Sequence, residues 1–131
     1  MKPVVIELDI VAMRYQYTVS YNYLESTTSF CTMGSETIKN VSEEKLLEFW
    51  NSIDGLKIWD WEKKYEELPE PKLDGVSWEL KLRSTKGNSL YSIGYENYPE
   101  NFNKLMEAFD TLIGLEFDED NRFYRDDEDL L

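Results

Sequence analysis

The feature that most constrains the fold is an alternation of apolar and polar side chains over residues 4–23. A period of two is typical of a strand with one buried face. Ile6, Leu8 and Ile10 occupy even positions. The later apolar residues occupy odd positions, and they are Met13, Tyr15, Tyr17, Val19, Tyr21 and Tyr23. A slip of one residue turns an apolar set to the other face of a sheet, so we predict a bulge or break near Val11–Ala12.

The next part of the chain predicts the rest of a hairpin and then a helix. Residues 28–34 alternate again and are predicted to return as a second strand. Ser42 is a good N-cap and Gly55 a helix stop, so we predict a helix from Glu43 to Asp54. Residues 56–65 are compatible with a short strand, and a loop is predicted over the two prolines that follow, in residues 66–75.

A second hairpin and a second helix are predicted in the last third of the chain. In residues 76–83 the apolar positions Val76, Trp78, Leu80 and Leu82 alternate with polar ones, and residues 90–95 form the partner strand. Pro99 suits the first position of a helix that ends at Gly114. Its apolar stripe has helical spacing and consists of Phe102, Leu105, Met106, Phe109, Leu112 and Ile113.

These elements predict an α+β fold in the order β-β-α-(β)-β-β-α. We expect an antiparallel sheet of four to five strands with two helices packed on one face. Residues 1–114 would form a single domain, followed by an acidic C-terminal segment at residues 115–131. Glu7 and Asp9 interrupt the first apolar run, and no stretch is long and apolar enough to cross a membrane. We therefore expect a cytoplasmic protein with no membrane association.

Composition narrows the chemistry further. The 27 acidic residues exceed the 14 basic ones, for a net charge of −13, and the chain has no histidine and one cysteine, Cys31. Nucleophiles activated by histidine, histidine-ligated metals and internal disulfides are therefore excluded. The six glycines lack the spacing of phosphate-binding loops, and the acidic excess disfavours direct binding of nucleic acid. The prediction is a non-enzymatic protein with no cofactor, no metal and an inert buried thiol.

The acidic C-terminal segment suggests what the protein contacts. It contains eight acidic and two basic residues and so accounts for −6 of the net charge. An acidic surface steers association with basic partners. We expect an inhibitor, immunity protein or nucleic-acid mimic that docks on a basic nucleic-acid-handling protein, such as a nuclease or defence effector. The predicted contact residues are Asp118, Glu119, Asp120, Asp126, Asp127, Glu128 and Asp129, with Tyr21 and Tyr23 for specificity.

Several alternatives remain open from the sequence. The tyrosine row to which Tyr21 and Tyr23 belong could simply pack beneath a helix. A small ligand or another protein could bind an aromatic groove made by Trp59, Trp61 and Trp78. A carboxylate-based hydrolase would use acids chosen from Asp60, Glu62 and Glu79. The cluster Lys81, Arg83 and Lys86 is the only basic patch, and balancing nearby acids is its simplest role. The oligomeric state is undetermined.

Two motifs carry a family resemblance. A Trp/Tyr segment precedes the strand motif Asp74-Gly75-Val76-Ser77-Trp78, and the residues Gly94, Asn97-Tyr98-Pro99 and Asn101-Phe102 open the last helix. Over residues 56–113 the chain resembles a group of small, uncharacterised bacterial proteins that share both motifs. The resemblance implies a similar fold and a bacterial or phage origin, and it implies no activity. In physical terms, Gly94 is expected to permit a close backbone approach and Asn97 a turn.

Overall fold

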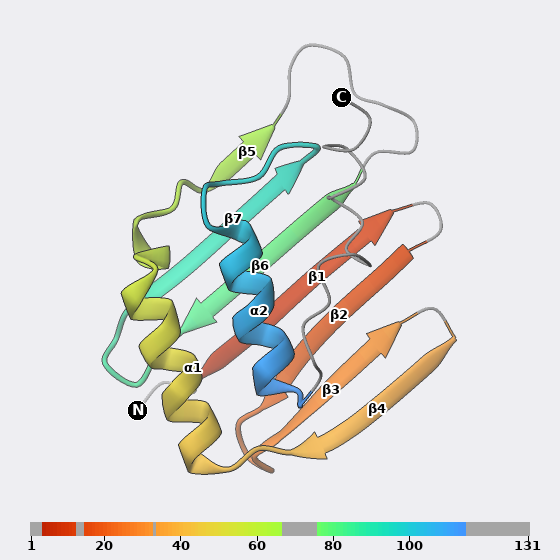
Figure 1. The fold of residues 1–131 in the computed structure, drawn as a ribbon, viewed down its shortest axis with the longest axis vertical. Coiled ribbons are helices and arrows are strands. Elements are labelled where there is room, and N and C mark those ends of the chain that lie inside the picture. Colours follow the sequence, from red (N-terminus) through yellow and green to blue (C-terminus); the bar gives the residue numbers. More distant parts are fainter. Residues whose placement is uncertain (1–3, 13–14, 33, 67–75, 115–131) are drawn as a thin grey trace.

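The computed structural model describes residues 4–12, 15–32, 34–66 and 76–114. Two helices lie side by side on one face of a single sheet (Figure 1). The strands are β1 (Val5–Ala12), β2 (Tyr15–Asn22), β3 (Thr27–Thr32), β4 (Ser35–Asn40), β5 (Lys64–Glu66), β6 (Ser77–Arg83) and β7 (Ser89–Tyr95). The helices are α1 (Glu43–Gly55), α2 (Phe102–Leu112) and a short 3-10 helix (Ile58–Asp60).

The chain is α+β, but the predicted antiparallel sheet of four to five strands is wrong. The sheet has seven strands in the order β4-β3-β2-β1-β6-β7-β5. It is mixed, because β5 pairs with β7 in parallel whereas the other neighbours pair antiparallel. β4 and β5 have no clear signal in the sequence. The strand predicted over residues 4–23 is in fact two strands, β1 and β2.

The alternation over residues 4–23 belongs to two antiparallel strands, and the predicted break near Val11–Ala12 is confirmed as the end of β1. In the β1–β2 register Leu8 lies opposite Val19 and Ile10 lies opposite Tyr17. Residues directly opposite one another share a face of the sheet. Even positions of β1 and odd positions of β2 therefore point to the same side, and the change of phase reflects a reversal of chain direction after Ala12.

β4 and β5 lie at the two edges of the sheet; no strand was predicted at β4, and β5 falls at the end of the segment 56–65 that was compatible with a short strand. All six residues of β4 are exposed, so this strand has no buried apolar face to produce an alternating pattern. β5 has only three residues, and the 3-10 helix precedes it in the segment that was ambiguous. Short, polar edge strands are how many proteins protect a sheet edge from further pairing.

The core lies between the helices and the sheet face that they cover. Its strand side includes the predicted Trp78, Leu80 and Leu82 of β6, and its helix side includes the predicted stripe of α2. On the helix side of β7, Leu90 packs against the core and is followed by two small residues, the fully buried Ser92 and Gly94, which lies opposite Trp78. A Cβ atom at Gly94 would overlap the Trp78 indole, so the expectation of a close approach at Gly94 is confirmed.

The predicted start of α1 at Glu43 is confirmed, whereas the predicted start of α2 at Pro99 is wrong. Ser42 accepts a hydrogen bond from the Lys45 amide and caps α1. Pro99 is not the first residue of α2, which begins at Phe102 after Asn101 has adopted a left-handed φ of 75°. Most of the predicted loop at 66–75 and the whole segment 115–131 lie outside the described residues.

Candidate functional site

The structure describes only two of the residues predicted to contact a partner. The seven acidic residues from Asp118 to Asp129 lie outside the described ranges. Tyr21 is half-buried and packs against the core, and Tyr23 is 42% exposed in the turn after β2. In the same tyrosine row, Tyr17 is buried in the core. This row therefore contributes more to packing than to an open contact surface.

A second group of carboxylates lies on the sheet face opposite the helices. Register places Glu7 and Asp9 of β1, Glu36 of β4 and Glu79 of β6 on this face, because each alternates with a residue on the helix side. We call these four residues the acidic face. No described helix covers it (Figure 1). The sequence placed Glu7, Asp9 and Glu79 on polar positions of strands but predicted no strand at Glu36, and the order of the strands was needed to bring all four onto one surface.

Neighbouring hydroxyl groups hold three of these carboxylates in fixed orientations. The Thr18 hydroxyl donates to Asp9 Oδ1 over 2.7 Å, and the Ser29 hydroxyl donates to Glu36 Oε2 over 2.8 Å. The Tyr91 hydroxyl donates to Glu79 Oε2 over 2.6 Å. Hydrogen bonds to ionised acceptors are among the stronger ones in proteins. The carboxylates are therefore ordered on a rigid sheet while their remaining lone pairs stay available.

The acidic face borders Lys81 and Arg83 of β6, which lie on the same side of the sheet, and Lys81 is opposite Glu7 in the β1–β6 register. None of its four carboxylates forms an ion pair with a described lysine or arginine. Asp9 lies directly opposite Glu79 in the β1–β6 register, a like-charge pairing that disfavours folding. The Glu79 carboxylate raises the pKa of Tyr91, first by accepting its hydrogen bond, with partial burial and charge repulsion adding to the effect. An arrangement of this kind is complementary to a positively charged surface on another molecule.

The cysteine and two of the candidate hydrolase acids lie on different elements of the described structure. The described residues contain no group of three or more histidine, cysteine or acidic side chains that could hold a metal ion. Cys31 is half-buried on the open face, 3.6 Å from Glu36, and so is not the buried thiol that was predicted. Glu79 is engaged by Tyr91, while Asp60 ends the 3-10 helix.

Of the three tryptophans predicted to form an aromatic groove, only Trp59 and Trp61 line one. Trp78 is 2% exposed, contacts the rings of Trp61 and Phe102, and donates from Nε1 to the Asn97 carbonyl over 2.9 Å. It is a core residue. Trp59 and Trp61 are half-buried instead, and both line an open groove at the sheet edge.

This groove, which we call the β7 groove, has a volume of about 730 Å³ and lies beside the first half of β7. Its lining comes from β1, β6, β7 and the segment that precedes β5. The chemically distinctive side chains are Trp59, Trp61, Lys63, Lys81, Arg83 and Tyr91. Lys81 and Arg83 were predicted to balance nearby acids, yet neither has an ion-pair partner in the described part of the chain.

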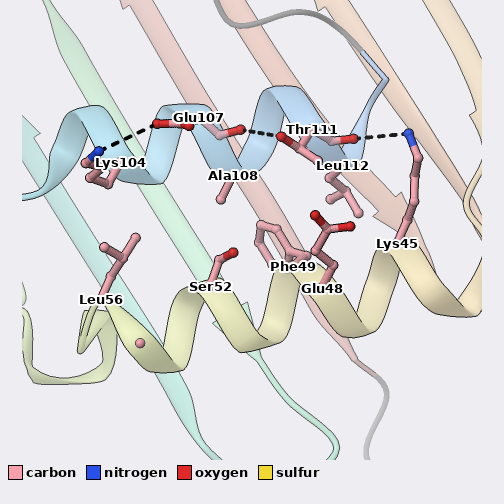
Figure 2. Close-up of a pocket in the computed structure, with 11 residues that line it drawn as sticks. Lys45, Glu48, Phe49, Ser52, Leu56, Lys104, Glu107, Ala108, Thr111 and Leu112 are labelled. Carbon is pink, nitrogen blue, oxygen red and sulfur yellow. Dashed lines mark hydrogen bonds and ion pairs between the residues drawn. The ribbon is translucent and has the colours of Figure 1, made fainter.

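A smaller groove of about 410 Å³ runs between α1 and α2 (Figure 2). Lys104 and Glu107 form an ion pair at 4.0 Å, and the Lys45 ammonium donates to the Thr111 carbonyl over 3.4 Å. Two lysines and two glutamates line this groove, which is therefore electrically balanced. Of these contacts only the Lys45–Thr111 hydrogen bond joins the two helices, and Phe49 and Leu112 are buried between them.

Comparison with known proteins finds no matching family model, no matching curated protein and no matching solved structure. Among the helices that the structure describes, none has the length and apolar character needed to cross a membrane. The assignment of function therefore depends on the surfaces themselves.

Proposed function

We propose that this chain is a non-enzymatic binding protein that docks on a basic partner protein through its acidic face. The observation that carries the proposal is the set of carboxylates on the uncovered side of the sheet, oriented by hydroxyl groups and left without ion-pair partners among the described residues. Ordered carboxylates lose less conformational freedom on binding than mobile ones do.

The partner that fits this surface best is a nucleic-acid-handling protein such as a nuclease or defence effector. Proteins of that class present lysine and arginine to phosphates. An inhibitor or immunity protein that acts as a nucleic-acid mimic would place Asp9, Glu36 and Glu79 against those cations. The acidic segment, with residues such as Asp118 and Asp126, adds negative charge that speeds the encounter.

The surface also has features of a protein interface beyond its charge. Val11 is 44% exposed and Ile38 63% exposed, and register places both on the same side of the sheet as the acidic face. Hydroxyl side chains such as Ser20 lie between them. Interfaces combine apolar contacts with polar groups in this way, and bulk apolarity is not what distinguishes them.

The test begins with capture from a bacterial lysate on the immobilised protein, followed by assays on the purified captured protein. We expect the captured protein to be basic, to be released by salt, and to be inhibited in DNA binding or cleavage. The triple variant Asp9→Asn, Glu36→Gln, Glu79→Gln should weaken its binding at least about tenfold, as expected when several charge contacts are lost. The matched control is Glu48→Gln, Glu100→Gln, Glu107→Gln, which removes the same charge elsewhere and should change binding far less.

A second variant, truncated after residue 115, measures the contribution of the acidic segment. Truncation should mainly slow association and reduce its dependence on salt, because exposed charges act chiefly on the on-rate. Binding that does not depend on salt would contradict the proposal. So would binding that survives both the triple substitution and the truncation unchanged.

A further inference from the structure

The β7 groove carries positive charge on an otherwise acidic protein. Lys63, Lys81 and Arg83 contribute three positive charges, and Glu7 is the one acidic residue in the lining, which leaves a net charge of +2. Lys81 and Arg83 are half-buried, and neither they nor Lys63 form an ion pair with a described residue. Partly desolvated cations that outnumber the nearby carboxylates favour the binding of an anion.

The aromatic side of the groove is held in place by packing. Trp59 stacks on Trp50 with ring centroids 6.0 Å apart, and its Nε1 donates to Asp54 Oδ1 over 2.7 Å. Trp61 stacks on Phe102 with centroids 6.2 Å apart. Both tryptophans remain half-buried, so part of each indole lines the groove. Such rigid indole surfaces bind planar rings at low entropic cost.

Tyr91 lines the groove together with the cations and the tryptophans. The Lys81 ammonium is 5.8 Å from the centre of the Tyr91 ring, and the Tyr91 hydroxyl donates to Glu79. The tyrosine therefore holds Lys81 near the groove through a cation–π contact. The groove borders the acidic face at this point, because Glu7 of that face lies opposite Lys81 in the β1–β6 register.

We infer that the β7 groove binds a small ligand that combines a dianionic phosphate monoester with a planar aromatic ring, the chemical class of a nucleoside monophosphate. A phosphate monoester carries a charge of about −1.5 to −2 at neutral pH, which matches the charge of the groove. The planar guanidinium of Arg83 suits bidentate contact with phosphate oxygens. A volume of about 730 Å³ is within the usual range for small-molecule sites.

The neighbouring charges favour a small ligand over a nucleic-acid strand. Glu7 lines the groove, and Asp9 and Glu79 lie on the same sheet face one pleat further along β1 and β6. A polyanion that continued out of the groove in that direction would meet these carboxylates, whereas a single nucleotide would not. Glu7 belongs to both surfaces, but the inference can be tested separately from the docking of a basic partner, because the substitutions that test the two proposals are at different side chains.

The experiment uses adenosine monophosphate as the probe, with adenosine and inorganic phosphate as its two parts. Binding to the full chain is followed by amide NMR shifts and by tryptophan fluorescence. We expect saturable binding of adenosine monophosphate, with shifts concentrated around β7 and Trp59, and binding of either part at least about tenfold weaker. Loss of charged hydrogen bonds of this kind typically changes affinity by that much or more.

Variants assign the binding to the groove. The double variant Lys81→Gln, Arg83→Gln should weaken binding at least about tenfold, and Trp59→Leu should weaken it while leaving phosphate contacts intact. Arg83→Lys keeps the charge but removes the planar fork, and it provides a milder test should the double variant fold poorly. Lys104→Gln removes a cation from the groove between the helices and should leave binding unchanged.

Three results would overturn the inference. One is the absence of saturable binding of adenosine monophosphate at millimolar concentration. Another is equal affinity for adenosine and its monophosphate, which would leave the cations without a role. The third is a short single-stranded oligonucleotide that binds more tightly per site than the mononucleotide, which would identify the groove as a nucleic-acid site instead.

Discussion

The Tyr17 hydroxyl on β2 donates a 2.7 Å hydrogen bond to Asp110 Oδ1 on α2, joining residues 93 positions apart in the sequence. Asp110 is fully buried and the Tyr17 side chain is 2% exposed. A buried carboxylate is costly unless it is hydrogen-bonded. This contact thus helps to tie α2 to the centre of the sheet, and it sets a specific position for the helix in an otherwise apolar interface.

Tyr17→Phe should destabilise the fold by about 1–3 kcal/mol, because it removes one hydrogen bond to a buried carboxyl group. The substitution keeps the ring that packs edge-on against Phe30 at 5.1 Å, so it removes little beyond the donor. Urea unfolding followed by circular dichroism gives the change. The control is Tyr23→Phe in an exposed turn, expected within about 0.5 kcal/mol of the parent chain. Equal stability of the two variants would show that the buried hydrogen bond contributes nothing.

Gly94→Ala should be strongly destabilising, whereas Gly55→Ala should not be. A Cβ atom at Gly94 overlaps the Trp78 indole, which is anchored by its hydrogen bond to Asn97. Overpacking of this kind costs about 1–3 kcal/mol or more. At Gly55, the last residue of α1, a Cβ atom meets open space, so alanine is expected to be neutral or stabilising by up to about 1 kcal/mol. Tryptophan fluorescence during urea unfolding distinguishes them, and a tolerated Gly94→Ala would contradict the packing described.

Glu79→Gln should lower the pKa of Tyr91 toward the ordinary tyrosine value. The Glu79 carboxylate raises that pKa by accepting the hydrogen bond and by repelling the phenolate. Phenolate absorbance titrations of the parent chain, Glu79→Gln and Tyr91→Phe isolate the Tyr91 contribution by difference. An identical Tyr91 titration in the parent chain and Glu79→Gln would refute the coupling.

The same pair predicts how stability depends on pH. Because folding raises the Tyr91 pKa, the folded state holds this proton more tightly than the unfolded state does. The stabilisation is therefore fully present below the unfolded tyrosine pKa of about 10, and it is lost as pH rises through the folded value. Thermal unfolding at neutral and alkaline pH should show a steeper alkaline loss in the parent chain than in Tyr91→Phe.

Asn101→Gly should be tolerated and Asn101→Val should destabilise the start of α2. Asn101 has a φ of 75°, a left-handed conformation that glycine and asparagine adopt easily and β-branched residues resist. The expected cost of valine is about 1–2 kcal/mol. Urea unfolding of the two variants provides the comparison, and the opposite order of stability would show that α2 begins differently. This conformation is the physical reason that the helix starts three residues after Pro99.

The acidic face and the β7 groove could be only partly anticipated from the sequence. Glu79, Lys81 and Arg83 were recognised as polar positions of an amphipathic strand, and Trp59 and Trp61 as candidates for a groove. Nothing local indicates that β4, β1 and β6 share one sheet with β1 next to β6, or that Trp78 is turned into the core while the other two tryptophans are not. A pattern along one strand reveals which face is polar, but not which charges meet across strands.

By itself the sequence determined the local elements: α1 from its cap at Ser42, the buried side of β6, and the apolar stripe of α2. Each follows from periodicity and capping within a few residues. Only the tertiary structure decided the number and order of the strands, the parallel pairing of β5, and the meeting of Tyr17 with Asp110. These depend on contacts between distant residues, whose geometry is set by the packing of the whole sheet against its helices and leaves no local periodic signal.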